Sequence, residues 1–174
     1  MRLINKIRFK LADRGLIALK NAPAELKENA EFVTKVLQTR GAEEFLYAGD
    51  CLRSDADYIL SRVYDMPEIL AYCAEVIYDW YMEDIDTFVG QPVDLTVFTA
   101  QCCEKNELAI EYLPINAAIE YYETAVINGT VVGTYHGKRY EKKLNVSDTG
   151  IAYMLLVRPE IGKCTDLTRS SMEI

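Results

Sequence analysis

The sequence predicts an α+β protein in which short helical repeats are followed by a small antiparallel β-meander. Up to about residue 123, apolar residues recur at helical spacing, in segments too short to bury their apolar side alone. From residue 124 the spacing changes to a period of two, and glycine-containing turns separate the segments. We therefore expect a helical-repeat body over residues 1–123 and a β-meander over residues 124–174 that packs on it as one structural unit.

One helical pattern occurs three times before residue 123. Each copy begins with Asn or Asp, which is followed by apolar residues three, four and eight positions later. The copies begin at Asn29, Asp55 and Asp94 and end near Gly41, Pro67 and Asn106. Asn and Asp at a helix start accept a hydrogen bond from a free backbone N–H, so each should cap a helix. A degenerate further copy fits residues 7–22.

The longest expected helix begins at Pro67, a residue that suits the first helical turn. Its apolar positions recur every three or four residues as far as Tyr81, and Gly90-Gln91-Pro92 interrupts the chain afterwards. Residues 93–100 also alternate like a strand. Their match to the repeat favours a helix instead.

Four strands are expected after residue 123. They span residues 124–127, 130–135, 139–146 and 151–157. Asn128-Gly129 is a strong hairpin signal and should join the first two. His136-Gly137 should form the second turn, and Gly133 suggests a β-bulge.

The most regular element of the repeat is Phe45-Leu46-Tyr47-Ala48, followed by Leu52 and Asp55. With the capping acid and the hydrophobic pair after it, this element resembles short helical repeats of unknown function that occur in tandem in some bacterial and phage-borne proteins. The resemblance covers about residues 15–113. It implies a helical fold and a binding role, but it does not indicate any particular activity.

Composition favours a folded cytoplasmic protein, in the host cytoplasm if the chain is encoded by a phage. Half of the 174 residues are hydrophobic, and no apolar run reaches the roughly 20 residues that span a bilayer. No apolar segment of the signal-peptide type follows the N-terminal charges. The five cysteines are an odd number, which favours reduced thiols over disulfides.

The sequence carries no recognisable catalytic or cofactor motif. His136 is the only histidine, and no Cys-x-x-Cys pair supplies zinc ligands. Phosphate-binding, dinucleotide-binding and serine-hydrolase motifs are absent from the sequence. We expect no enzyme, no cofactor and no metal. The less favoured alternative is a cysteine- or metal-dependent enzyme that pairs His136 with Cys103 or Cys164, or binds a cation at residues 83–86.

Negative charge is concentrated in the middle of the chain. Residues 41–125 hold 18 Asp/Glu and 3 Lys/Arg, a net charge of −15, whereas residues 1–40 carry +5 and residues 126–174 carry +2. Tyrosines and the one tryptophan are interleaved with these acids, and both residue types anchor interfaces when they are exposed. The expected partner-binding residues are Asp65, Glu68, Glu75, Asp79, Trp80, Glu83, Asp84 and Asp86.

This charge pattern suggests a non-enzymatic protein that binds a basic surface of a partner protein. A field of one sign speeds association with a partner of opposite sign. The leading hypothesis is an inhibitor that occludes or mimics nucleic acid in a basic channel, as phage anti-defence proteins of the anti-CRISPR type do. One alternative is a scaffold whose helical groove holds a peptide. In the simplest alternative, the acids only cap helices and keep a surface hydrated.

The first residues form a basic amphipathic segment. Its cations are Arg2, Lys6, Arg8, Lys10 and Arg14, and Leu3, Ile7 and Leu11 lie on another side. Such a segment fits an anionic membrane or phosphate. The sequence favours a hydrated first helix that neutralises the acidic centre, so we expect no contact with a membrane and no direct contact with nucleic acid.

Overall fold

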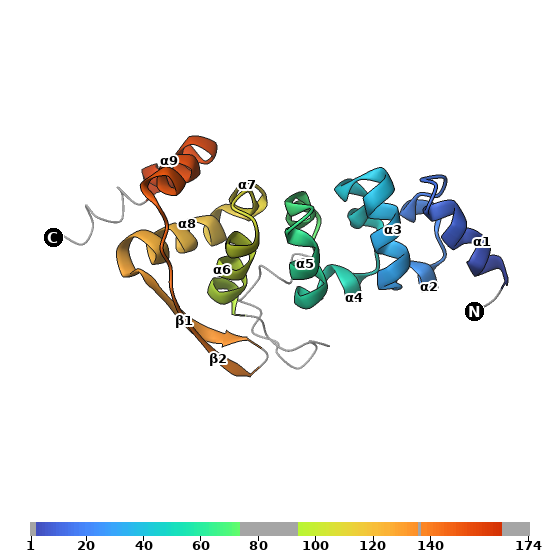
Figure 1. Cartoon of the computed structure of the whole chain (residues 1–174), viewed down its shortest axis with the longest axis horizontal. Coiled ribbons are helices and arrows are strands. Elements are labelled where there is room, and N and C mark those ends of the chain that lie inside the picture. Colours follow the sequence, from blue (N-terminus) through green and yellow to red (C-terminus); the bar gives the residue numbers. More distant parts are fainter. Residues whose placement is uncertain (1–2, 74–93, 136, 165–174) are drawn as a thin grey trace. The chain divides into compact units, whose positions relative to one another are not determined.

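The computed structural model describes residues 3–73, 94–135 and 137–164 (Figure 1). Contacts within the chain divide it into two units, Met1–Ile77 and Tyr78–Ile174. This division falls earlier than the expected boundary at residues 123 and 124. The repeat helices are therefore distributed over both units, and the β-structure shares the second unit with several helices.

In the first unit, longer helices alternate with short helical segments. The order is α1 (Leu3–Ala12), η1 (Leu19–Asn21), α2 (Ala24–Lys27), α3 (Ala30–Arg40), η2 (Ala42–Tyr47), α4 (Asp50–Arg53), α5 (Ala56–Val63) and η3 (Pro67–Tyr72). The short α2 and α4 begin 26 residues apart, the same spacing as the caps Asn29 and Asp55. The repeat in the sequence is thus a repeat in the structure of this unit.

The expected caps are confirmed. The side chain of Asn29 accepts a hydrogen bond from Phe32 N at 2.9 Å, and that of Asp55 accepts one from Tyr58 N at 3.0 Å. At the other end of α3, Gly41 has a φ of +108°, which side chains rarely adopt. Asn29 and Gly41 therefore determine where α3 begins and where it ends.

The apolar positions of the repeat form the core of the first unit. Side chains with at most 1% exposure include Phe32, Val33, Val36, Leu37, Phe45, Ile59, Val63, Ile69 and Leu70. Two ring contacts join successive repeats: Phe9 meets Phe32 edge-on at 5.2 Å, and Phe45 stacks on Tyr58 at 5.9 Å. Neighbouring repeats thus complete the burial that a single repeat cannot achieve.

A buried carboxylate joins the first two repeats. Glu44 is only 7% exposed, and its Oε2 accepts a hydrogen bond from the backbone N of Leu19 at 2.7 Å. Its Oε1 accepts from Arg40 Nε at 2.8 Å, and Arg40 Nη1 donates to Gly15 O at 3.0 Å. Glu44 belongs to the acidic stretch of the sequence. Because its side chain is buried, it stabilises the contact between two repeats and does not contribute to an acidic surface.

We expect Glu44→Ala to lower the free energy of unfolding by about 2–3 kcal/mol, because the N–H of Leu19 would lose its acceptor at a buried position. Glu44→Gln keeps an acceptor oxygen and should cost less. Urea denaturation followed by circular dichroism measures both, with the exposed neighbour substitution Glu43→Ala as the matched control. Equal stability of Glu44→Ala and Glu43→Ala would show that the carboxylate does not hold the joint.

The second unit combines helices with one hairpin. Its elements are α6 (Leu95–Lys105), α7 (Ala109–Tyr112), α8 (Ile115–Glu123), η6 (Thr124–Asn128), β1 (Thr130–Tyr135), β2 (Lys138–Lys143) and α9 (Asp148–Val157). Asp94 caps α6 by accepting from Thr96 N and Val97 N, so the helix expected over residues 93–100 is confirmed. Helices and a small antiparallel sheet together confirm the α+β class.

Only two of the four expected strands form. β1 and β2 pair antiparallel from Thr130↔Lys143 to Tyr135↔Lys138. β1 matches the strand expected over residues 130–135. β2 corresponds to the strand expected over residues 139–146 but ends at Lys143. Between the two strands, Gly137 has a φ of +70°, which suits the expected second turn, while His136, the other residue of that turn, lies outside the described residues.

The strand expected at residues 124–127 is wrong. These residues continue α8 as the π-helical segment η6, and Thr124 and Ala125 extend its buried side. Gly129 has a φ of +65°, and its N–H donates to Thr124 O at 2.6 Å. Asn-Gly therefore ends a helix here, because the left-handed glycine that suits a hairpin turn also suits a helix C-terminus.

The fourth strand, expected at residues 151–157, is also wrong, since these residues belong to α9. The side chain of Ser147 accepts a hydrogen bond from Gly150 N at 3.1 Å and caps this helix. Ala, Met and Leu in the segment are strong helix formers. A short apolar run fits a strand or a helix, and here the cap and the propensities select the helix.

Gly133 does not form the expected bulge. It pairs with Tyr140 in the regular register of the hairpin. A Cβ at this position would lie 2.0 Å from Asp94 Oδ2 and 2.6 Å from Val97 Cγ2. The same Oδ2 accepts a hydrogen bond from Thr134 N at 3.2 Å, so glycine allows α6 and β1 to approach closely.

We expect Gly133→Ala to destabilise the second unit by about 1–3 kcal/mol, because Asp94 would have to leave both its cap and β1. Val132→Ala is the matched control, since Val132 is the adjacent residue of β1 and is 53% exposed. Thermal unfolding of both variants measures the difference. A Gly133→Ala protein as stable as the control would contradict the close approach.

The helix that starts at Pro67 is shorter than expected. Pro67 starts a helix as expected, but residues 67–72 form the 3-10 helix η3, which ends before Cys73, whose backbone is extended with a ψ of 159°. The expected helical positions from residue 74 to Tyr81 lie outside the described residues. Among the helices that are described, none combines the length and the apolarity needed to cross a bilayer.

Candidate functional site

Two of the eight expected partner-binding residues are described. Asp65 follows α5 and Glu68 lies in η3; both are exposed, and neither forms an ion pair with a described residue. The other six, Glu75, Asp79, Trp80, Glu83, Asp84 and Asp86, lie outside the described residues.

Exposed carboxylates gather along the later part of the first unit. They are Glu43, Asp50, Asp55, Asp57, Asp65 and Glu68. The cations of residues 41–73 are Arg53 and Arg62. Arg53 donates from Nε to Tyr72 O at 3.1 Å, so one of the two serves to hold the end of η3.

Charge is therefore polarised along the first unit. Described residues 3–40 hold 8 Lys/Arg and 4 Asp/Glu, whereas residues 41–73 hold 2 and 7. Because the repeats stack in chain order from α1 through α3 to α5, one end of this array is basic and the other acidic (Figure 1). We call the segment from α4 to η3 the acidic end.

In the second unit, the acids are largely engaged with the same unit. Glu104 forms an ion pair with Lys142 at 2.7 Å and accepts a hydrogen bond from Tyr140 Oη at 3.1 Å. Glu111 accepts from Tyr153 Oη, and Glu120 from Thr96 Oγ1. These carboxylates hold the hairpin, α9 and α6 in place, which leaves the acidic end of the first unit as the clearest acidic surface of the described chain.

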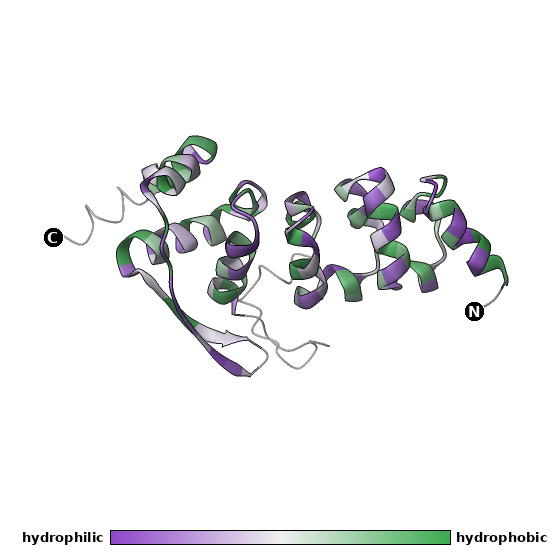
Figure 2. Cartoon of the chain, in the orientation of Figure 1, coloured by the Kyte–Doolittle hydropathy of each residue, from purple (hydrophilic) through white to green (hydrophobic). Residues whose placement is uncertain are grey.

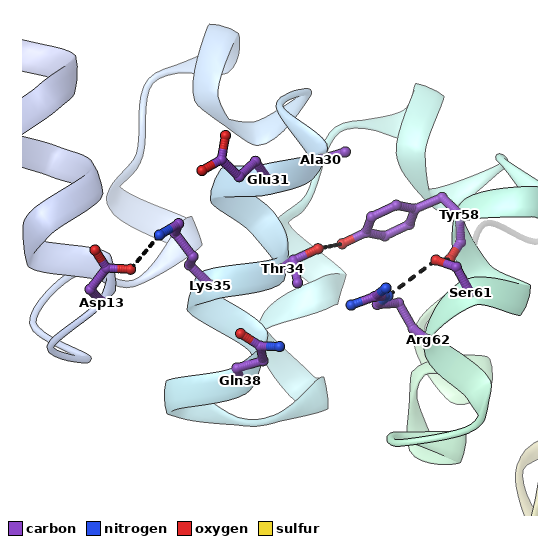
Figure 3. A pocket seen from close by; sticks show the side chains of 9 residues that line it. All are labelled: Asp13, Ala30, Glu31, Thr34, Lys35, Gln38, Tyr58, Ser61 and Arg62. Carbon is purple, nitrogen blue, oxygen red and sulfur yellow. Dashed lines mark hydrogen bonds and ion pairs between the residues drawn. The ribbon is translucent and has the colours of Figure 1, made fainter.

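A shallow groove of about 450 Å³ lies on the outer side of α3 and α5 (Figure 3). We call it the α3–α5 groove. Its lining is Asp13, Ala30, Glu31, Thr34, Lys35, Gln38, Tyr58, Ser61 and Arg62. On α3 the lining residues are spaced three or four apart, which places them on one side of the helix.

Hydrogen bonds across the α3–α5 groove join successive repeats (Figure 3). Thr34 Oγ1 and Tyr58 Oη lie 3.1 Å apart, and Lys35 Nζ donates to Asp13 Oδ1 at 2.6 Å. The hydrogen bond that Lys35 donates to Asp13 raises the pKa of Lys35, and burial raises the pKa of Tyr58. Both residues thus keep their protons at neutral pH.

The α3–α5 groove offers both donors and acceptors to a ligand. Arg62 donates from Nε to Ser61 Oγ at 3.1 Å, while Glu31 and Gln38 are exposed at the rim. A carboxylate, an amide and a guanidinium at short spacing suit an extended peptide with mixed polarity. These residues were not predicted from the sequence. The signal that could have indicated them is their place at the outward positions between the buried residues of each repeat.

A smaller pocket of about 180 Å³ lies in the second unit. Cys103, Tyr121, Tyr153 and Ser147 are among its lining residues. Desolvation, followed by the nearby Glu104, raises the pKa of the Cys103 thiol far above its ordinary value. Desolvation also raises the pKa of Tyr121 and that of Tyr153. The thiol and the phenols of this pocket are therefore uncharged at neutral pH.

The described residues do not assemble a metal site. In residues 3–73, 94–135 and 137–164, no three His, Cys, Asp or Glu side chains come close enough to hold an ion. The proposed partner of the cysteines, His136, lies outside the described residues, so the structure does not test a Cys–His pair.

Comparison with known proteins adds no relative. No protein-family model, curated protein or solved structure matches this chain.

We expect Cys103 to react far more slowly with iodoacetamide than the exposed Cys51 at neutral pH, because a thiol with a raised pKa supplies little thiolate. Peptide mass spectrometry after timed alkylation compares the two sites in one sample. Denaturation in urea should equalise their rates. Faster alkylation of Cys103 in the folded protein would contradict this prediction and favour the cysteine-enzyme alternative.

Proposed function

We propose that this chain is a non-enzymatic protein-binding module whose acidic end engages a basic surface of a partner protein. The observation that supports this proposal most directly is the set of five exposed carboxylates between residues 50 and 68, in a segment with two arginines. Two of the five, Asp65 and Glu68, form no ion pair with a described residue. Soluble surfaces usually intersperse both signs of charge. A surface of one sign instead favours encounter with an oppositely charged partner.

The proposed partner is a nucleic-acid-binding enzyme. Its channel presents lysine and arginine side chains spaced for phosphates. Carboxylates on a folded helical surface can occupy that channel and exclude the nucleic acid. The resemblance of the repeats to phage-borne proteins suggests an anti-defence role of this kind, acting in the host cytoplasm.

A second candidate function is a scaffold that holds a peptide in the α3–α5 groove. The observation that favours it is the groove itself, whose lining includes Glu31, Gln38 and Arg62 as hydrogen-bonding groups for a peptide. Repeat proteins commonly use such a surface of stacked helices for binding. This mode depends on short polar contacts, whereas the first depends on long-range charge.

The two candidates differ in salt dependence. Exposed charges farther apart than about 10 Å are screened at ordinary ionic strength, so charge-driven binding weakens steeply with salt. Peptide binding through short contacts in the groove should change little. Affinity measured at low and at physiological salt therefore separates them.

Charge reversal at the acidic end tests the leading proposal. The unmodified chain is used as bait in a nuclease-treated bacterial lysate, captured proteins are identified, and their affinity is measured by calorimetry. We expect Asp65→Lys/Glu68→Lys to weaken binding on the order of tenfold or more at low salt, because attraction becomes repulsion. Replacement of Glu83, Asp84 and Asp86 with Lys should abolish binding.

The matched control is Glu25→Lys, an exposed acid of α2 at the other end of the same unit. It should leave the affinity nearly unchanged. If both sets of reversals leave the affinity at low salt unaltered while Gln38→Ala/Arg62→Ala abolishes it, the groove is the binding site and the acidic proposal fails.

A further inference from the structure

Helix α1 leaves an apolar stripe uncovered at the basic end of the repeat array. Leu3 is 74% exposed, Ile4 60% and Ile7 52%, and Leu16 just after the helix is 67% exposed. Figure 2 shows hydrophobic positions on α1 as on the helices within the array. We call these four residues the α1 stripe.

The orientation of α1 places the stripe opposite its own packing side. Phe9 meets Phe32 of α3, and Ala12, which is fully buried, accepts a hydrogen bond through its carbonyl from Thr39 Oγ1 at 3.1 Å. At about 100° per residue, Ile7 lies on the opposite side of the helix from Phe9. In α3, by contrast, Phe32 is buried against Phe9 of the helix before it.

The surroundings of the stripe are basic. Lys6, Lys10 and Arg14 are exposed around it, and Asp13, the acid nearest in the chain, is paired with Lys35. A symmetric contact between two copies through this stripe would bring their lysines together, which is unfavourable. The surface that fits must be apolar and negatively charged.

We propose that the α1 stripe and its lysines dock on an anionic lipid surface. Its apolar residues are all aliphatic, whereas protein–protein hot spots are enriched in Trp, Tyr and Arg. A helix with aliphatic residues on one side and lysines beside them lies in the membrane interface, where the lysine heads reach the phosphates. The sequence alone favoured a hydrated first helix without membrane contact. The proposal differs from that prediction because the exposure of the stripe is known only from the structure.

Two features of the first unit assist this docking. α1 is already folded on α3 through Phe9 and the Asp13–Lys35 ion pair, so binding needs no helix formation. The acidic end lies at the opposite end of the same array and is repelled by anionic lipid. The unit would therefore approach with α1 first, which leaves the acidic end free for a protein partner.

Vesicle cosedimentation of the full chain tests the inference. The protein should sediment with phosphatidylcholine vesicles that contain phosphatidylserine, and not with phosphatidylcholine alone. Ile4→Gln/Ile7→Gln should weaken binding roughly tenfold or more, because two apolar side chains lose their burial in lipid. Both side chains are exposed, so folding should be unaffected, which circular dichroism verifies. Lys6→Glu/Lys10→Glu should abolish the preference for anionic lipid.

The matched controls lie in the second unit. Leu156→Gln changes an aliphatic residue that is 79% exposed, and Lys138→Glu changes an exposed lysine; both should bind vesicles like the unmodified chain. The inference is overturned if the unmodified chain ignores anionic vesicles or if the α1 variants bind as well as the controls. It is also overturned if the chain is a dimer that Ile4→Gln/Ile7→Gln dissociates. Asp65→Lys/Glu68→Lys should still bind vesicles, so this test and that of the proposed function fail independently.

Discussion

The structure of the first unit depends on contacts between successive short repeats, because none of them can bury its apolar side chains alone. Phe9 against Phe32 and Phe45 against Tyr58 supply the apolar part of these contacts. The Glu44 carboxylate supplies the polar part, since it satisfies the backbone of one repeat from within the next. The relative placement of these repeats fixes which side chains remain at the surface, and therefore where the groove, the acidic end and the α1 stripe lie.

The acidic residues of this protein have two different roles. Glu44 joins repeats, Asp55 starts a helix, and Asp94 both starts α6 and contacts β1. These carboxylates are stabilised by hydrogen bonds. Asp65 and Glu68 are exposed without an ion pair to a described residue, so their charge is available to a partner. This second group is smaller than the total charge of the segment suggests.

The two ends of the first unit differ in charge and in apolar exposure. A basic end with aliphatic side chains and an acidic end with exposed carboxylates attract different kinds of surface. If both proposals hold, the protein partner and the lipid surface bind at opposite ends of the same repeat array. The α3–α5 groove lies between these ends and offers a third type of contact, based on short hydrogen bonds.

The sequence by itself determined the features that depend on neighbouring residues. The caps at Asn29, Asp55 and Asp94, the glycine after α3 and the hairpin of β1 and β2 follow from local hydrogen bonding and backbone preference. Asn128-Gly129 and residues 151–157 were ambiguous, because each pattern suits two local structures. Only the tertiary structure decided those cases, the burial of Glu44, the lining of the groove and the exposure of Ile7. Each of these depends on residues that are distant in the chain, and apolar or charged character alone does not reveal which neighbours cover a side chain.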